Sequence, residues 1–127
     1  MVDEIITGKK KILIVDDEQF IRESYQELLT QEGYDVTVAK DGQEGFDLAI
    51  QQKPDLILMD IKMPVMDGFT AFEKLKSNSI FVPVIFLTNI GDTEHVLEAK
   101  EAAATSFLIK SNIKPEDLFS EIKRVLQ

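Results

Sequence analysis

The sequence predicts a single α/β domain built on a doubly wound, five-stranded parallel sheet with helices on both faces. Its 127 residues, 44% of them hydrophobic, are enough for one domain with a continuous core. Five short apolar segments alternate with segments whose apolar residues recur at helical spacing, and the connections between them are short. The uninterrupted apolar run at residues 56–59 is typical of a strand that is covered on both faces.

The first half of the chain predicts three strands, each followed by a helix. Strands are expected at residues 12–15, 34–39 and 56–60, and apolar stripes predict helices around 21–29, 46–50 and 69–75. Gly33 stands where a helix commonly ends in a left-handed residue. Pro54 cannot continue the second helix, because it lacks an N–H group.

The second half repeats this pattern. Residues 82–87 predict the fourth strand, with Pro83 near its start, where a missing N–H is best tolerated. A helix is expected at residues 92–103, and residues 107–109 predict the fifth strand. The last helix is expected to begin at Pro115, since proline favours the first helical turn.

Composition excludes several classes of protein. The chain has no cysteine, so it can form neither a disulfide nor a thiolate metal site, and a reducing compartment such as the cytoplasm is the expected location. It has no apolar run long enough to insert into a membrane. A net charge of -9 opposes direct binding to nucleic acid. Residues 1–10 are expected to form a flexible tail before a domain at 11–127.

Polar residues stand at the carboxyl ends of four predicted strands. They are Asp16 and Asp17, then Asp60, Thr88 and Lys110. Because parallel strands end at the same edge of a sheet, three carboxylates, a hydroxyl and an ammonium should converge there. Carboxylates held close together either raise one another's pKa or demand a cation, and Mg²⁺ is the natural candidate for such a cation. Such a set would support phosphoryl transfer to a carboxylate, with Asp60 as the acceptor.

Each of these residues also has a structural interpretation. Asp16 and Asp17 could favour the N-terminus of the following helix, Thr88 could cap a turn, and Lys110 could be solvated. Asp60 could merely turn the chain after its strand. Each structural interpretation is favoured when a residue is taken alone, whereas the coincidence of all five at strand ends favours a site.

With these residues at its strand ends, the chain resembles the receiver domain of two-component response regulators from residue 11 to its C-terminus. The matching segments are 15–18 after the first strand, 60–64 and 66–68 after the third, 87–88 at the end of the fourth and 107–110 at the end of the fifth. The resemblance implies a flavodoxin-like, three-layer fold with strand order 2-1-3-4-5. It places the site in the crevice between strands 1 and 3.

The resemblance also implies specific roles at the acidic end. Asp60 would accept a phosphoryl group from a sensor histidine kinase or a phosphotransfer protein. Asp17, Asp60 and the backbone carbonyl of Lys62 would bind Mg²⁺ or Mn²⁺, and Asp16 would act through water.

Further roles implied by the resemblance concern the phosphoryl group and the output. Thr88 and Lys110 would bind the phosphoryl oxygens, and Phe107 would change rotamer between the two states. The fifth strand and its flanking helices would then bind a downstream protein target, as a monomer or a weak, phosphorylation-dependent dimer. The domain would not be an enzyme, beyond supporting its own phosphorylation and dephosphorylation.

Three other functions are compatible with parts of this pattern. A flavin-binding module shares this topology, but the acidic residues 16–18 would repel an FMN phosphate. A pseudo-receiver that binds proteins without phosphorylation is the main alternative, and the intact acidic set argues against it. An aspartyl phosphatase would carry a second aspartate two residues after the nucleophile, where this chain has Lys62.

Overall fold

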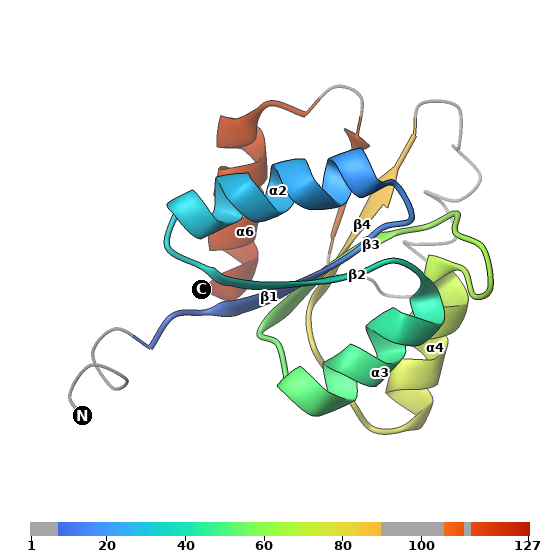
Figure 1. Cartoon of the computed structure of the whole chain (residues 1–127). Coiled ribbons are helices and arrows are strands. Elements are labelled where there is room, and N and C mark those ends of the chain that lie inside the picture. Colours follow the sequence, from blue (N-terminus) through green and yellow to red (C-terminus); the bar gives the residue numbers. More distant parts are fainter. Residues whose placement is uncertain (1–7, 90–105, 111–112) are drawn as a thin grey trace.

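The structure is a computed structural model, which describes residues 8–89, 106–110 and 113–127. Its helices and strands form three layers (Figure 1). In chain order they are β1 (Lys11–Val15), α2 (Gln19–Gln31), β2 (Asp35–Ala39), α3 (Gly42–Gln52), β3 (Leu56–Asp60), α4 (Gly68–Ser77), β4 (Val84–Thr88), β5 (Ser106–Ile109) and α6 (Pro115–Leu126). The helix expected at 92–103 lies outside the described residues.

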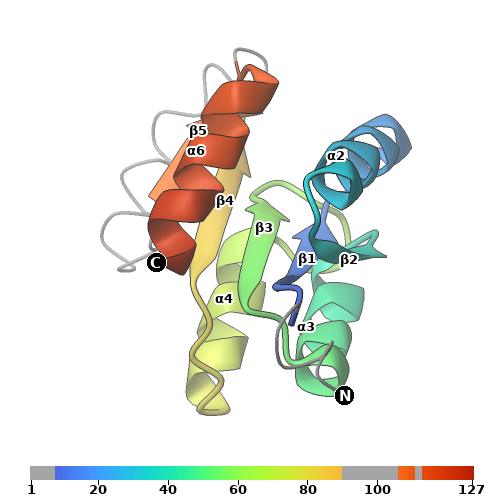
Figure 2. The same cartoon turned by 90° about the vertical axis from the view of Figure 1, so that its left-hand side faces the viewer.

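The strands form one sheet in the order β2-β1-β3-β4-β5, and every neighbouring pair is parallel. Figure 2 shows β1, β3 and β4 running in the same direction through the centre of the molecule. The predicted fold class and strand order are therefore confirmed. All five carboxyl ends point to one edge of the sheet, where α/β proteins of this topology place their functional groups.

Helices α2 and α6 cover one face of the sheet, and α3 and α4 cover the other (Figure 1). Successive strand residues point to opposite faces, so each strand contributes to both cores. Ile14 packs with Leu29 on the α2 side, whereas Val15 packs with Phe46 on the α3 side. Burial on both faces explains why the central strands read as continuous apolar runs.

Helix ends follow the predicted signals. Gly33, just after α2, has a φ of +96°, which is the left-handed conformation predicted for it. Helix α3 ends before Pro54, and its C-cap Lys53 has a φ of 49°. Pro115 occupies the first turn of α6, as expected.

The fourth strand differs from its prediction. It was expected at residues 82–87 but runs from Val84 to Thr88. Pro83 has no N–H to donate, and its carbonyl oxygen accepts a hydrogen bond from the Ile57 amide at 3.0 Å. The strand therefore begins at Val84, directly after the proline and two residues later than expected. At the other end, Thr88 stays in register with Ile109 of β5.

Residues 8–10 are exposed, and the carbonyl of Lys10 accepts a hydrogen bond from the Asp35 amide at 2.9 Å. No helix of the described residues combines the length and the low charge that a membrane crossing requires.

Candidate functional site

Four of the predicted site residues come together at the carboxyl edge of the sheet. Asp16 directly follows β1, Asp60 ends β3, Thr88 ends β4 and Lys110 follows β5. All four are buried, with exposed fractions of 0%, 3%, 1% and 9%. Buried polar groups of this kind need partners, and the partners define the site.

Lys110 lies at the centre of the acidic residues. Its Nζ is 3.0 Å from Asp16 Oδ2, 3.0 Å from Glu18 Oε1 and 3.4 Å from Asp60 Oδ2. Among the described residues, the contact with Glu18 is a hydrogen bond, whereas the contacts with Asp16 and Asp60 are ion pairs. The lysine thus neutralises part of a strongly negative cluster.

Almost every polar atom of Asp16 makes a hydrogen bond that fixes its position. Its amide donates to Ala39 O at 3.0 Å, and its Oδ1 accepts from the Glu18 amide at 2.9 Å. Its carbonyl accepts from Arg22 Nη1 at 2.8 Å. Its Oδ2 pairs with the Lys110 charge but receives no hydrogen bond from the described residues.

A hard divalent cation suits the acidic edge. One carboxylate oxygen each of Asp16, Asp17 and Glu18 lie within 4.8 Å of one another. The buried Asp16 Oδ2 has no hydrogen bond from the part of the chain that the structure describes, and Mg²⁺ prefers carboxylate oxygens as ligands. Asp60 is not a member of that group of three, although its carboxyl group interacts with that of Asp17. The donor set therefore fits the predicted metal, with Glu18 as an additional carboxylate.

Burial and charge perturb the acid–base behaviour of the site. Burial, followed by the charge of Asp16, raises the pKa of Asp60 to about 7, although Lys110 opposes the shift. Burial also raises the pKa of Asp16. Burial alone would lower the pKa of Lys110, but the adjacent Asp16 and Asp60 carboxylates raise it, so the lysine stays charged.

The remaining predicted residues surround this centre. Within the described residues, Thr88 Oγ1 makes a long contact, 3.4 Å, to the carbonyl of Asn89. Phe107 is half-buried, packs against the core on the α3 and α4 side, and pairs with Phe86 across β4 and β5. Lys62 lies exposed in the loop after β3.

The loop from β3 to α4 packs closely against the site. Gly68 donates its amide to the carbonyl of Ile61 at 2.7 Å. A Cβ atom at position 68 would lie 2.3 Å from the carbonyl oxygen of Asp60, so only glycine fits there. Asp67 caps α4 by accepting a hydrogen bond from the Thr70 amide at 2.8 Å.

Two residues of the site did not emerge from the sequence. Glu18 belongs to the acidic run after the first strand, and that run was the signal that could have identified it as a partner of Lys110. Arg22 lies one turn into α2 and holds the carbonyl of Asp16. Nothing in its sequence position indicates that contact.

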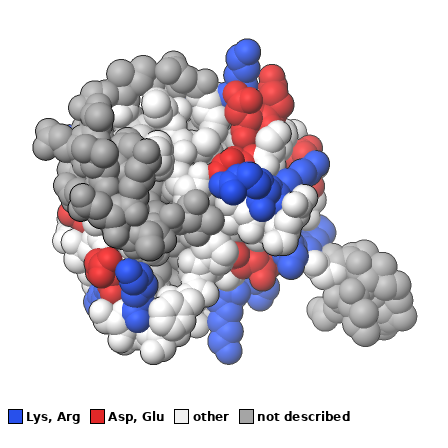
Figure 3. Space-filling view, turned by 180° about the vertical axis from the view of Figure 1, so that it is seen from behind, with Lys and Arg blue, Asp and Glu red and all other residues white. Residues whose placement is uncertain are grey.

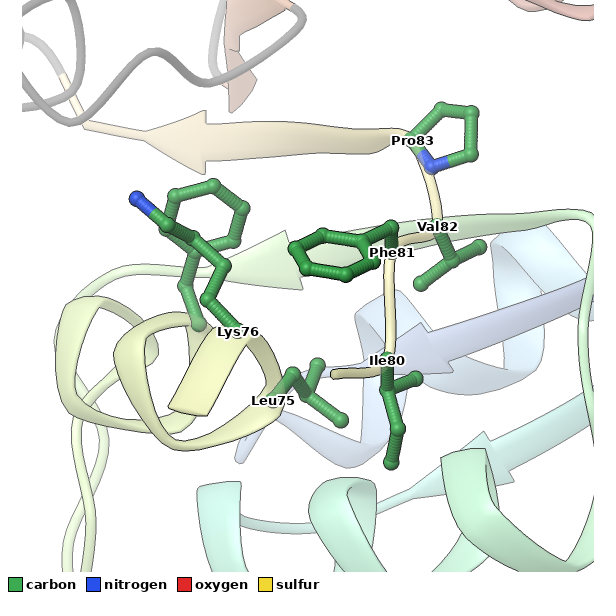
Figure 4. A pocket seen from close by; sticks show the side chains of 7 residues that line it. Leu75, Lys76, Ile80, Phe81, Val82 and Pro83 are labelled. Carbon is green, nitrogen blue, oxygen red and sulfur yellow. The ribbon is translucent and has the colours of Figure 1, made fainter. Parts of the chain in front are cut away.

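An apolar cavity of about 390 Å³ lies at the other end of the sheet, before β4 begins. Figure 4 shows Leu75, Lys76 and residues 80–83 around it. It contains no carboxylate or hydroxyl group, so it does not compete with the acidic edge as a reacting site.

Lys/Arg and Asp/Glu side chains of the described residues are interspersed on the face opposite to that of Figure 1 (Figure 3). This distribution differs from the continuous basic stripe that tracks a phosphate backbone.

Comparisons with known proteins agree with the geometry. The family model described as the response regulator receiver domain matches residues 12–123. A probable transcriptional regulator ycf27 of Guillardia theta is 37% identical over 99% of this chain and 49% of its own length. The transcriptional regulatory protein PdtaR of Mycobacterium tuberculosis is 40% identical over 80% of this chain and 49% of its own length. The chain thus spans about half the length of these relatives.

Solved structures give the same result for the fold. The chemotaxis protein CheY4 of Vibrio cholerae superposes with a TM-score of 0.85 at 36% identity, covering 93% of this chain and 99% of that chain. A CheY-like response regulator receiver domain protein of Methanospirillum hungatei JF-1 has a TM-score of 0.85 at 33% identity, with 93% and 94% covered.

Proposed function

The chain belongs to the receiver domain family of response regulators, which act in two-component signal transduction, and on this premise we propose that Asp60 accepts a phosphoryl group from the phosphohistidine of a sensor histidine kinase or phosphotransfer protein. One observation carries the proposal. Asp60 ends β3 at the carboxyl edge of the sheet, with Lys110 Nζ 3.4 Å from its carboxylate and Asp16 on the neighbouring strand end. A carboxylate beside a fixed ammonium suits attack on a phosphoryl group.

The transfer exchanges one bond for another. A carboxylate oxygen of Asp60 bonds to phosphorus, and the bond from phosphorus to the imidazole nitrogen breaks, leaving its electron pair on the nitrogen. The product is an acyl phosphate on Asp60. Only the ionised carboxylate can attack, so a pKa of about 7 makes the supply of positive charge important at neutral pH.

Lys110 and Thr88 bind the transferred group in this proposal. The Lys110 ammonium reaches both Asp16 and Asp60, so it can donate to a phosphoryl oxygen beside the acceptor. The Thr88 hydroxyl is buried on the adjacent strand, and its contact to Asn89 is long, so it can turn toward a second oxygen.

Asp17, Asp60 and the carbonyl oxygen of Lys62 would hold Mg²⁺ or Mn²⁺, with Asp16 acting through a water molecule. Such an ion would supply positive charge against the carboxylates and the phosphoryl oxygens. The carboxylates of Asp16, Asp17 and Glu18 within 4.8 Å of one another, and the Asp16 oxygen without a hydrogen bond, support this assignment.

The output is proposed to pass through β5. Phe107 pairs with Phe86 two residues before Thr88 on β4, so a Thr88 hydroxyl that moves toward the phosphoryl group can change the packing of Phe107. The altered surface of β5 and its flanking helices would bind a downstream protein in the cytoplasm, as a monomer or a weak, phosphorylation-dependent dimer. The acidic net charge of -9 argues against direct contact of this domain with nucleic acid.

The test is intact-mass measurement after incubation with acetyl phosphate and Mg²⁺. We expect the parent to gain the mass of one phosphoryl group, and both the Asp60→Asn variant and the parent in excess chelator to remain unmodified. An unmodified parent would favour the alternative, a pseudo-receiver that binds its partners without phosphorylation.

A further inference from the structure

The Lys110 ammonium already has carboxylate partners before any phosphoryl group arrives. Asp16, Glu18 and Asp60 place an oxygen 3.0, 3.0 and 3.4 Å from its Nζ. Among the described residues, Glu18 Oε1 is the one of these oxygens that accepts a hydrogen bond from the ammonium. One of the three N–H donors is therefore held by Glu18, and it must be released before all three can serve Asp60 and a phosphoryl oxygen.

The three carboxylates differ in how easily they can leave. The side chain of Asp16 is 0% exposed and that of Asp60 is 5% exposed, whereas that of Glu18 is 53% exposed. A buried carboxylate that loses its cation is strongly destabilised, while an exposed one is rehydrated by water. Glu18 is therefore the partner that can separate from Lys110 at the lowest cost.

The position of Glu18 agrees with a separable contact. It is the N-cap residue of α2, and its side chain makes no capping hydrogen bond to that helix. Its Oε1 accepts a hydrogen bond from Lys110 at 3.0 Å, across 92 residues of sequence. The side chain thus joins the start of α2 to the end of β5 through this one contact.

We propose that Glu18 holds Lys110 in the unphosphorylated protein and releases it when Asp60 is phosphorylated. The release step rests on the function proposed above, whereas the holding contact does not. A contact present in only one of two states favours that state, so Glu18 opposes phosphorylation and tunes its rate. Repulsion between Glu18 and the phosphoryl oxygens drives the release.

The first experiment measures the rate of phosphorylation by acetyl phosphate at saturating Mg²⁺. We expect Glu18→Gln, which keeps the size of the side chain, to react roughly twofold to fivefold faster than the parent, as suits a partly exposed ion pair. Glu18→Asp keeps the charge but is one methylene shorter, so it should also react faster.

Glu23→Gln is the matched control. Glu23 is exposed on the same helix and pairs with Gln19 at 2.6 Å, so its replacement removes one negative charge without touching Lys110. We expect it to react at the parental rate. Equal rates for Glu18→Gln and Glu23→Gln would show that Glu18 has no specific effect. A Glu18→Asp rate equal to that of the parent would assign the effect to charge alone, and either outcome would overturn the proposal.

A second experiment tests the holding contact without any phosphodonor. The side-chain NMR resonances of Lys110 should move in Glu18→Gln and stay in place in Glu23→Gln. Unchanged Lys110 resonances in Glu18→Gln would overturn the proposal. If they move while the parent is never phosphorylated, the proposed function and the release step fail together, and only the holding contact stands.

Discussion

The burial that makes Asp60 reactive also lowers the stability of the folded protein. It ends an apolar strand and is 3% exposed, so its ionised form lies in a poor environment beside Asp16 and Asp17. Its pKa of about 7, against 3.8 for an ordinary aspartate, means that the folded protein keeps a proton that the unfolded chain releases. The contribution of this group to stability is therefore complete below pH 3.8 and is lost as the pH rises through about 7.

Asp60→Asn should remove this pH dependence, because an amide cannot ionise. In chelator at pH 8, we expect the variant to exceed the parent in free energy of unfolding by roughly 2 to 4 kcal/mol. The difference should shrink toward pH 5. Urea denaturation at pH 5, 6, 7 and 8 measures it, with the exposed Asp47→Asn as the control. A constant difference across this range would show that Asp60 is not the titrating group.

Val65 is a second residue near the site, and the loop after β3 gives it a backbone conformation that valine itself disfavours. Its φ is 71°, and the amide of Met66 donates to the carbonyl of Pro64 at 2.7 Å across it. This is a tight three-residue turn that strains any residue with a Cβ atom, and a β-branched one most. The side chain is 82% exposed, so it gains little from packing.

Val65→Gly should therefore raise the free energy of unfolding by about 1 kcal/mol. Val65→Ala keeps the Cβ atom and loses only the branching, so its gain should be smaller. Urea denaturation of both variants in one buffer provides the measurement. A glycine variant less stable than the parent would mean that the Val65 side chain stabilises the loop.

At the scale of elements, helix α3 is anchored by its first residues. Asp41, its N-cap, accepts a hydrogen bond from the Glu44 amide at 2.9 Å, and Glu44 in turn accepts from the Lys40 amide at 2.7 Å. The first contact satisfies an amide that the helix itself leaves unpaired, and the second ties the residue before the cap to the first turn of the helix.

Asp41→Ala should lower the free energy of unfolding by about 1 kcal/mol, the usual cost of losing a cap. Asp41→Asn keeps an acceptor oxygen and should stay close to the parent. Thermal unfolding of the pair isolates the capping bond. Equal losses in both variants would assign the effect to charge.

The sequence predicted elements well where one local signal sufficed. Continuous apolar runs identified β1 and β3, and Gly33 and Pro115 marked helix boundaries correctly. Prediction failed where the outcome depends on contacts distant in sequence. The sequence predicts the start of β4 two residues too early. Whether the missing N–H of Pro83 interrupts the strand depends on its hydrogen bonding with β3, which lies far from it in sequence.

For the whole molecule, the parallel sheet explains why so much of the site could be predicted. Parallel strands bring their carboxyl ends to one edge, so Asp16, Asp60, Thr88 and Lys110 converge once the strands are identified. Which atoms then pair is decided by side-chain geometry. For that reason the contact between Glu18 and Lys110 became visible only in the structure.

The assignment of Asp60 as the sole acceptor of the phosphoryl group can be tested directly. Reduction with borohydride after incubation with acetyl phosphate and Mg²⁺ converts an aspartyl phosphate to homoserine, and tandem mass spectrometry locates that residue in the chain. We expect homoserine at position 60 only, and none in the presence of excess chelator. Homoserine at position 16 or 17, or at none although the intact protein has gained a phosphoryl group, would contradict the account.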